Sequence, residues 1–567
     1  METIKFRDVT FSYPLSERNA LDGISFGVNE SEFIVVCGKS GCGKSTLLKH
    51  MKKNLIPYGN FEGEITYGGE NITELEDRKS AAEIGFVQQN PDNQIVTDKV
   101  WHELAFGLEN LGLDNLAIKR RVSEMASYFD IQAWFRKDVS QLSGGQKQLL
   151  NLSSIMTMQP KLLILDEPTS QLDPIAASEF LQTLHKINRD LGTTVILSEH
   201  RLEEAFTMAD KVMVMDEGRV IAFDTPRNIG QFLGERKGKD KHPMFYGLPS
   251  VMKIYQDTDG QGESPLTIRE GRLWLESLTK DKDIVIPEDL MLAAKADKKK
   301  DEKIENPIIE IKDLWFKYDQ RSGEVLRGLN LQVEKGQLFC VLGGNGVGKS
   351  TTLKAISGMI KPQRGKIQVD GISVKKENLY ELFDNRLAML PQNPQALFTE
   401  ITVEEELLEA MHYMKLDDDD KIQNVEDMLD LMELRALRKS HPYDLSGGEQ
   451  QRLALGVILL LNPKIILLDE ATKGLDPFFK RTLAKILRKL VDDGVTIFMV
   501  SHDIEFCAEY ADKCAMFFDG SIVSVGTPRE FFSGNNFYTT SANKISREWC
   551  PSAITYQEVS KWIKATV

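Results

Sequence analysis

Residues 38–45 have the sequence Gly-Lys-Ser-Gly-Cys-Gly-Lys-Ser, and residues 343–350 have the sequence Gly-Gly-Asn-Gly-Val-Gly-Lys-Ser. Both match the pattern G-x-x-x-x-G-K-[ST], in which backbone N–H groups of a glycine-rich loop surround a phosphate at the start of a helix. The two lysines lie 305 positions apart (349 − 44), and an apolar, strand-like run precedes each loop. This repeat predicts two nucleotide-binding modules in one chain.

The size and composition of the chain fit two or more separately folded domains. It has 567 residues, of which 41% are hydrophobic and 27% are charged. The sequence contains neither an apolar run long enough to span a membrane nor a signal peptide at its start, so we expect the chain to stay in the cytoplasm. The formal net charge of −15 argues against a protein that mainly binds nucleic-acid phosphates.

The six cysteines are scattered without a C-x-x-C pair, which disfavours a zinc or iron–sulfur site and predicts reduced thiols. Cys42 lies inside the first phosphate loop, where it is either a redox switch or simple loop filler. The acidic run 417–420 is predicted to be an exposed loop.

Each phosphate loop belongs to a longer repeated pattern. Apolar runs at 162–165 and 465–468 predict buried strands downstream of the loops, which indicates an α/β core with a largely parallel sheet. Helical patterns at 100–111 and 403–414 predict a helical subdomain inserted into each module.

The predicted domain organisation has a small appendix after each module. Residues 266–275 resemble residues 554–563 at a constant offset of 288 (555 − 267). A threonine followed three residues later by glutamate favours a capping helix in both, whose tryptophan packs on its parent domain, over a ligand site. The charged run 298–303 predicts a solvated linker. We expect a first nucleotide-binding domain over 1–235, an appendix and charged linker over 236–306, a second nucleotide-binding domain over 307–535 and a C-terminal appendix over 536–567.

The residues of the phosphate loops suit the binding of ATP. The lysines would contact the β- and γ-phosphates, and the serines that follow them are placed to ligate Mg²⁺. The expected nucleotide-binding residues of the loops are Gly38, Gly41, Gly43, Lys44, Ser45 and Thr46 in the first copy and Gly343, Gly346, Gly348, Lys349, Ser350 and Thr351 in the second.

Two adjacent carboxylates end each of the predicted buried strands downstream. Because successive side chains of a strand point in different directions, the two carboxylates of a pair have different tasks. Asp166 and Asp469 suit the Mg²⁺ shell, whereas Glu167 and Glu470 are positioned to polarise an attacking water as general bases.

Between these motifs lie Leu-Ser-Gly-Gly-Gln at 142–146 and Leu-Ser-Gly-Gly-Glu at 445–449, at an offset of 303 (446 − 143). With them the chain resembles the ATP-binding cassette (ABC) family, whose L-S-G-G-Q motif is highly specific, over essentially its whole length apart from the appendices. The resemblance implies two tandem ABC nucleotide-binding domains in a head-to-tail sandwich. Each ATP is then held by the phosphate loop of one domain and the L-S-G-G segment of the other.

Because both domains are on one chain, the resemblance pairs each phosphate loop with the distant signature segment. Lys44 would face Ser446 and Gly448, and Lys349 would face Ser143 and Gly145. Gly144 and Gly447 complete the nucleotide-binding residues of the signature segments.

The resemblance also assigns four further pairs of positions. They are Tyr13 and Tyr318 for stacking on adenine, Gln89 and Gln392 for sensing Mg²⁺ and the γ-phosphate, His200 and His502 as switch histidines, and Asp173 and Asp476 for the loop that links the two sites. A tyrosine at a strand end can instead belong to the core. A lone histidine is usually structural, but these two histidines occupy equivalent positions at an offset of 302, which favours the functional interpretation.

Both sites keep the lysine, the Mg²⁺ aspartate, the general-base glutamate and the histidine, so two active ATPase sites are expected. Their sequences are not identical. The first signature segment lacks the arginine that the second keeps as Arg452, Glu449 replaces the family's glutamine, and residues 471–474 replace the usual Pro-Thr-Ser-Gly. These departures put the equality of the two sites in doubt.

Within the family, the chain looks like the fused ATPase of energy-coupling factor transporters, which take up vitamins and transition-metal ions in prokaryotes. The likeness rests on residues 89–94 with 106–110, on residues 392–398, and on Ser-Glu-His-Arg at 198–201. It implies a transmembrane coupling protein and a membrane substrate-binding subunit as partners, no nucleic acid, and a peripheral location on the cytoplasmic face of the cell membrane.

Two alternatives remain open. One is a soluble twin-cassette protein that acts on the ribosome. Against it, residues 236–306 contain 14 Lys plus Arg and 14 Asp plus Glu, whereas ribosomal RNA would require a basic linker. The segments that follow the two glutamates also lack the Asn-His of such proteins. The other alternative is the fused ATPase of a sugar importer, which differs only in its partner. The sequence does not identify the cargo.

Overall fold

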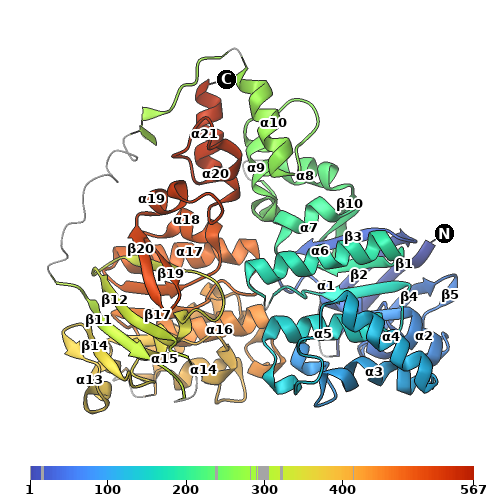
Figure 1. Ribbon diagram of the computed structural model, residues 1–567, viewed down its shortest axis with the longest axis horizontal. Helices are drawn as coiled ribbons and strands as arrows, with labels where there is room; N and C mark the ends of the chain where they lie inside the picture. Colours follow the sequence, from blue (N-terminus) through green and yellow to red (C-terminus); the bar gives the residue numbers. More distant parts are fainter. Residues whose placement is uncertain are drawn as a thin grey trace. The chain divides into compact units, whose positions relative to one another are not determined.

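The computed structural model describes residues 2–14, 18–170, 172–235, 241–280, 282–288, 290–291, 306–319, 323–412, 414 and 416–566. They form two compact units, one made mainly of residues before 267 and the other mainly of residues from 267 onward (Figure 1). The charged run 298–303 lies outside the described residues. Among the described helices, none has the length and apolar character needed to cross a lipid bilayer.

The first unit contains two β-sheets. A four-stranded antiparallel sheet has the order β2 (Leu21–Asn29), β1 (Glu2–Ser12), β4 (Asn60–Tyr67) and β5 (Glu70–Asn71). A six-stranded sheet has the order β10 (Arg219–Asp224), β9 (Lys211–Asp216), β3 (Phe33–Gly38), β8 (Thr194–Ser198), β7 (Leu162–Asp166) and β6 (Ile84–Val87). In the larger sheet every neighbouring pair is parallel except β9 and β10. The carboxyl ends of β3, β6, β7 and β8 therefore share one edge.

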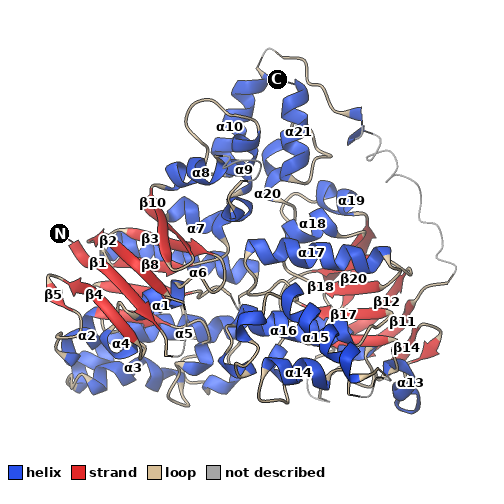
Figure 2. Ribbon diagram, turned by 180° about the vertical axis from the view of Figure 1, so that it is seen from behind, coloured by secondary structure: helices blue, strands red, loops and turns tan. Residues whose placement is uncertain are grey.

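Helices accompany the strands of this unit (Figure 2). They are α1 (Lys44–Lys49), α2 (Asp77–Glu83), α3 (Val100–Asn110), α4 (Asn115–Tyr128), α5 (Gly144–Met156), α6 (Pro174–Leu191), α7 (Leu202–Met208), α8 (Pro226–Gly234) and α9 (Ser250–Asp257). Helices α3, α4 and α5 pack on one another, as expected for a helical subdomain inserted between the first and second groups of motifs.

The second unit repeats this plan. Its four-stranded sheet has the order β12 (Leu326–Val333), β11 (Ile309–Phe316), β14 (Arg364–Val369) and β15 (Ile372–Ser373). Its six-stranded sheet has the order β16 (Leu387–Leu390), β17 (Ile465–Asp469), β18 (Thr496–Val500), β13 (Leu338–Leu342), β19 (Lys513–Phe518) and β20 (Ser521–Gly526). Its helices are α10 (Ile268–Thr279), α12 (Lys349–Ile356), α13 (Leu379–Phe383), α14 (Val403–Glu409), α15 (Asp418–Leu431), α16 (Gly447–Leu460), α17 (Pro477–Asp492), α18 (Ile504–Tyr510), α19 (Pro528–Gly534), α20 (Ser541–Ser546) and α21 (Tyr556–Thr566).

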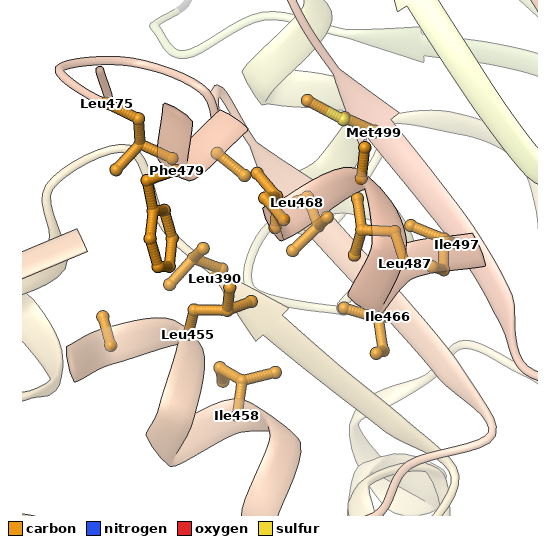
Figure 3. Close-up of a cluster of buried hydrophobic side chains, with 14 of the residues drawn as sticks. Leu390, Leu455, Ile458, Ile466, Leu468, Leu475, Phe479, Leu487, Ile497 and Met499 are labelled. Atoms are coloured by element: carbon orange, nitrogen blue, oxygen red, sulfur yellow. The ribbon is translucent and has the colours of Figure 1, made fainter. Parts of the chain in front are cut away.

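The central strands are apolar along their whole length because both faces of the parallel sheet are covered. In the second unit, α16 and α17 pack on one face, and α12 with the four-stranded sheet packs on the other. Every residue of β7 and of β17 is buried, which confirms the predicted strands at 162–165 and 465–468. Figure 3 shows how Ile466 and Leu468 of β17 meet Leu455 of α16 and Leu487 of α17 in the core of the second unit. This packing fixes the strand ends that carry the paired carboxylates.

Two regions differ from the sequence-based expectations. The acidic run 417–420 is not a loop, because Asp417 caps α15 by accepting a hydrogen bond from the Asp420 N–H at 2.9 Å, and the next three aspartates form the first turn. Negative charge is favourable there, where the helix dipole is positive. Helix α10, which follows the first module in sequence, belongs to the second unit and packs against α20. Trp562, the tryptophan of the C-terminal appendix, is fully buried.

Candidate active site

Each phosphate loop joins a buried strand to a helix, and its last glycine has a backbone that other residues avoid. Gly43 has a φ of +100°, and a Cβ atom there would lie 2.3 Å from the Ala20 carbonyl oxygen. Gly348 has a φ of +115°, and its Cβ would lie 2.8 Å from the Val325 carbonyl oxygen. Only glycine accepts both constraints, so these positions fix the loop against the neighbouring strand.

The lysine of each loop bends back over the loop's own carbonyl groups. The Lys44 ammonium donates to the Gly38 oxygen at 3.0 Å and to the Lys39 oxygen at 2.9 Å, and Lys349 makes the same pair of bonds at 2.9 and 2.6 Å. Burial alone would lower the pKa of Lys44, but nearby acidic groups, including Glu167, raise it above its ordinary value. Both loops therefore hold a fixed positive charge.

In the first unit, Asp166 and Glu167 leave the end of β7 in different directions. The Ser198 hydroxyl donates to Asp166 at 2.8 Å and accepts a hydrogen bond from the Glu167 N–H at 2.9 Å. Burial and the neighbouring Glu167 charge raise the pKa of Asp166. Glu167 has a φ of +44°, an uncommon conformation for a residue with a side chain and one that is found repeatedly at functional sites.

The structure brings Gln89, Glu167 and His200 together, although they follow three different strands. The Gln89 amide donates to one Glu167 oxygen at 2.7 Å, and His200 Nε2 lies 2.8 Å from the other. Burial alone would raise the pKa of Glu167, but the His200 charge and hydrogen bond outweigh it and hold the pKa at about 2. The carboxylate is thus ionised and aimed by two partners, as a general base requires.

The second unit has a similar arrangement with one difference. The Ser350 hydroxyl donates to Asp469 at 3.0 Å, and His502 Nε2 lies 3.3 Å from Glu470 and 3.2 Å from the Lys349 ammonium. Burial raises the pKa of Asp469 to about 6. The pKa of Glu470 is lowered, because the His502 hydrogen bond and nearby cations outweigh the effect of burial, and its φ is +56°.

Gln392 does not repeat the contact of its counterpart. It is exposed, and no hydrogen bond joins it to Glu470 among the described residues. The two sites therefore differ at the glutamine, which follows Gln88 in the first cassette and Pro391 in the second.

The predicted adenine-stacking tyrosines stand beside the phosphate loops. The Tyr13 hydroxyl is 3.0 Å from the Thr46 hydroxyl, and the Tyr318 hydroxyl is 3.1 Å from that of Thr351. Their residues are 39% and 58% exposed, so the aromatic rings have surface available to a ligand and do not belong to the core.

The signature segments form the starts of two long helices. The Ser143 hydroxyl caps α5 in a capping box with Gln146, and Ser446 caps α16 in the same way with Glu449. Gly144 and Gly447 are exposed. An exposed glycine-rich helix start can receive a phosphate, because its N–H groups and dipole attract anions. Of the linking aspartates, Asp173 caps α6, and Asp476 is buried.

Sequence reasoning missed three buried glutamates. Glu199 accepts hydrogen bonds from the His200 and Arg201 N–H groups at 3.0 and 3.2 Å and thereby fixes the backbone of the switch histidine. Glu103 accepts from the N–H groups of residues 96 and 97, and Glu406 accepts from those of residues 399 and 400. For Glu103 and Glu406, a glutamate within an otherwise apolar helix face was the available signal.

The thiols take no part in this site. All six cysteines are unbridged and buried. Burial raises the pKa of the Cys42 thiol, which disfavours the reactive thiolate and supports the interpretation of Cys42 as loop filler over the redox switch.

Comparison with known proteins agrees with this geometry. The family model described as ABC transporter matches residues 21–170 and 326–473. A protein of Bacillus thuringiensis subsp. konkukian, named "Putative ABC transporter ATP-binding protein", is 40% identical over 555 residues, which are 98% of this chain and 97% of that protein. A Methanosarcina acetivorans protein of the same name is 33% identical over 546 residues, or 94% and 86% of the two chains.

Among solved structures, cbiO1 of Clostridium perfringens, described as part of the ABC transporter complex cbiONQ, is 32% identical. The match covers 40% of this chain and 90% of that one, with a TM-score of 0.37. The predicted fold class of two tandem α/β cassettes is confirmed by the two family matches and the two repeated sets of sheets. The chain belongs to the ABC transporter family, as an ATP-binding protein that carries two ATPase cassettes coupled to transport.

Proposed function

We propose that this chain is the ATP-hydrolysing motor of a membrane importer of the energy-coupling factor type, which takes up a vitamin or a metal ion. The observation that carries the ATPase part is the convergence of Gln89 and His200 on the ionised Glu167. The importer type is supported by the sequence likeness of the segments around the two glutamine loops. The chain would then work on the cytoplasmic face of a prokaryotic cell membrane.

In this proposal the chain has two composite ATP sites, and each site is built from parts of both cassettes. Lys44 and Lys349 bind the phosphates, and Ser446 with Gly448, or Ser143 with Gly145, contact the nucleotide held by the other cassette. Glu167 and Glu470 take a proton from the attacking water, and the adjacent histidine holds each carboxylate in its ionised form.

The oxygen donors beside each loop fit Mg²⁺. Ser350 donates to Asp469 at 3.0 Å, and a hydroxyl and a carboxylate are hard oxygen ligands of the kind that Mg²⁺ prefers. Ser45 and Asp166 occupy the same positions in the first cassette, with Gln89 and Gln392 as further oxygen donors. The bound ion would supply neutralisation of charge on the phosphate that is transferred.

Two exposed apolar positions next to the glutamine loops support a protein partner. The buried carboxylates of Glu103 and Glu406 each hold two consecutive N–H groups of the segment after the loop, so the segments are rigid. Val96 belongs to the first of these segments and is 67% exposed. Ile401 directly follows the second segment and is 71% exposed. A fixed segment with an exposed aliphatic side chain suits the docking of a coupling helix from a transmembrane protein.

The proposal is tested by affinity purification of the tagged chain from native membranes in mild detergent. We expect a polytopic membrane protein and a small hydrophobic companion in stoichiometric amounts, and the companion would identify the class of cargo. Replacing Val96 and Ile401 with arginine should release both proteins. The matched control is Leu116→Arg, because Leu116 is 79% exposed on α4. Recovery of ribosomes with no membrane protein would refute the importer and favour the ribosome-associated alternative.

A further inference from the structure

A pocket of about 620 Å³ lies in the first unit outside the nucleotide-binding residues. Thr225, Arg227 and Asn228 at the start of α8 line it, together with Gln256 of α9 and the loop that contains Ser264. The mechanism assigned to the cassettes uses none of these side chains. Most of the lining groups are polar, so a ligand here would be held by hydrogen bonds and charge.

The start of α8 lacks the cap that its counterpart in the second cassette has. Residues 225–227 and 527–529 are both Thr-Pro-Arg, at an offset of 302. In the second copy Glu530 accepts a hydrogen bond from the Thr527 N–H at 2.9 Å in a capping box. In the first copy Asn228 replaces that glutamate, and among the described residues no side chain caps α8 and no acid lies in its first turn. The positive end of the α8 dipole is thus not neutralised from within the helix.

Ser264 gives a second and independent indication of a ligand. It is only 7% exposed, and its hydroxyl has no hydrogen-bond partner among the described residues. Its counterpart Ser552, at the offset of 288, has the Cys550 thiol 3.8 Å from its hydroxyl, whereas Gly262 occupies the position of that cysteine in the first copy. A buried hydroxyl without a partner is costly unless a ligand or water supplies one.

Arg227 adds a positive charge to the same wall. Its guanidinium donates to the Ser264 carbonyl oxygen and lies 3.0 Å from Glu263. The Glu263 side chain is 77% exposed, so water screens this ion pair. Asp224, also exposed, accepts a hydrogen bond from the Thr225 N–H at 2.6 Å, next to the start of α8.

We propose that this pocket binds a small anionic molecule through a phosphate or carboxylate group placed at the start of α8, between Arg227, Asn228 and the Ser264 hydroxyl. The volume exceeds that of a single oxyanion, so the remainder of the molecule would lie toward Gln256. The ligand takes the place that the Glu530 carboxylate occupies in the second cassette. The junction between the first cassette and its appendix is thereby a metabolite-binding site, independent of the proposed transport partner.

The test uses the Glu167→Gln/Glu470→Gln chain saturated with ATP and Mg²⁺, so that the phosphate loops are filled. Equilibrium dialysis with radiolabelled inorganic phosphate, and separately with citrate, measures the remaining sites. We expect one site per chain for at least one of the two anions. Asn228→Glu rebuilds the capping sequence of the second copy and should weaken binding at least about tenfold while raising the unfolding temperature.

The matched control is Asn228→Gln. Its side chain has the length of the glutamate in Asn228→Glu but no charge, so this variant should keep the site. Ser264→Ala should weaken binding by several-fold, because it removes one hydrogen bond. Binding of phosphate alone or citrate alone would identify the preferred group. The proposal is overturned if neither anion binds to the ATP-saturated chain, or if Asn228→Glu binds as tightly as Asn228→Gln does.

Discussion

Replacing the two strand-end glutamates with glutamine should stop the chemical step and leave ATP bound. The pKa of Glu167 is about 2, so near pH 7 the carboxylate is ionised and has an oxygen that can accept a proton from water. A glutamine amide cannot accept the proton. General-base catalysis contributes roughly 10²- to 10⁴-fold, which corresponds to about 3–5 kcal/mol of activation free energy. We expect this loss at the site of each substitution.

The substitution also disturbs the contacts of the side chain in a defined way. Glu167 now faces two donors, the Gln89 amide at 2.7 Å and His200 Nε2 at 2.8 Å, and a glutamine has only one oxygen with which to accept. ATP affinity should nevertheless stay within about threefold, because the phosphate-binding Lys44 is untouched. The rise in activation free energy should therefore appear in the rate constant of hydrolysis.

The assay is single-turnover hydrolysis of γ-labelled ATP by Glu167→Gln, Glu470→Gln and the double variant, with nucleotide binding measured in parallel. Glu179→Gln is the matched control, since Glu179 is exposed on α6. If the sites act independently, each single variant keeps one fast phase; if they act only together, both single variants are slow. Turnover by the double variant at the rate of the unmodified chain would refute the assignment of both bases.

Further predictions concern the loops and the pairing of the cassettes. Burial raises the pKa of Asp469 to about 6 from 3.8, so its ionised form disfavours folding by roughly 3 kcal/mol above pH 6 and by less as the pH falls toward 4. Asp469→Asn should therefore raise the unfolding temperature of the nucleotide-free chain near pH 7.5, leave it unchanged near pH 4, and weaken binding of ATP with Mg²⁺; a lower unfolding temperature near pH 7.5 would contradict this. Gly43→Ala should destabilise the chain by at least about 1–2 kcal/mol in denaturant unfolding, whereas Gly144→Ala, whose Cβ meets nothing within 4 Å, should cost under about 0.5 kcal/mol. Lys44→Ala should abolish tight ATP binding at one site of two, and equal loss at both in a binding titration would contradict the proposed pairing. Ser446→Arg should block the same site as Lys44→Ala, which photolabelling with an ATP analogue can distinguish from loss of the other site.

The sequence predicted the parts of the site that are local. The phosphate loops and the strands that end in Asp166 and Asp469 follow from short motifs, because glycine spacing and apolar runs determine them directly. The burial of Glu103 and Glu406 had a signal in their apolar helix faces, but the backbone N–H groups that their carboxylates bind do not follow from that pattern. The exposure of Gln392 was not predicted either: both glutamines precede Asn-Pro, yet among the described residues Gln89 reaches the glutamate of its cassette and Gln392 does not.

Charge patterns were the least informative part of the sequence. The acidic run at 417–420 suggested an exposed loop, but the same aspartates stabilise the start of α15, and composition alone does not separate these two outcomes. The partner of α10 was also unpredictable, because its apolar stripe gives no information about which surface covers it.

The central claim is that one chain holds two ATP sites of the ABC type. The most direct measurement is the number of ATP molecules retained per chain by the Glu167→Gln/Glu470→Gln variant after rapid removal of free nucleotide in the presence of Mg²⁺. The account predicts two, with one lost when Lys44→Ala is added and the other when Lys349→Ala is added. The account would be contradicted if the variant retained one ATP per chain and only one of the two lysine substitutions removed it.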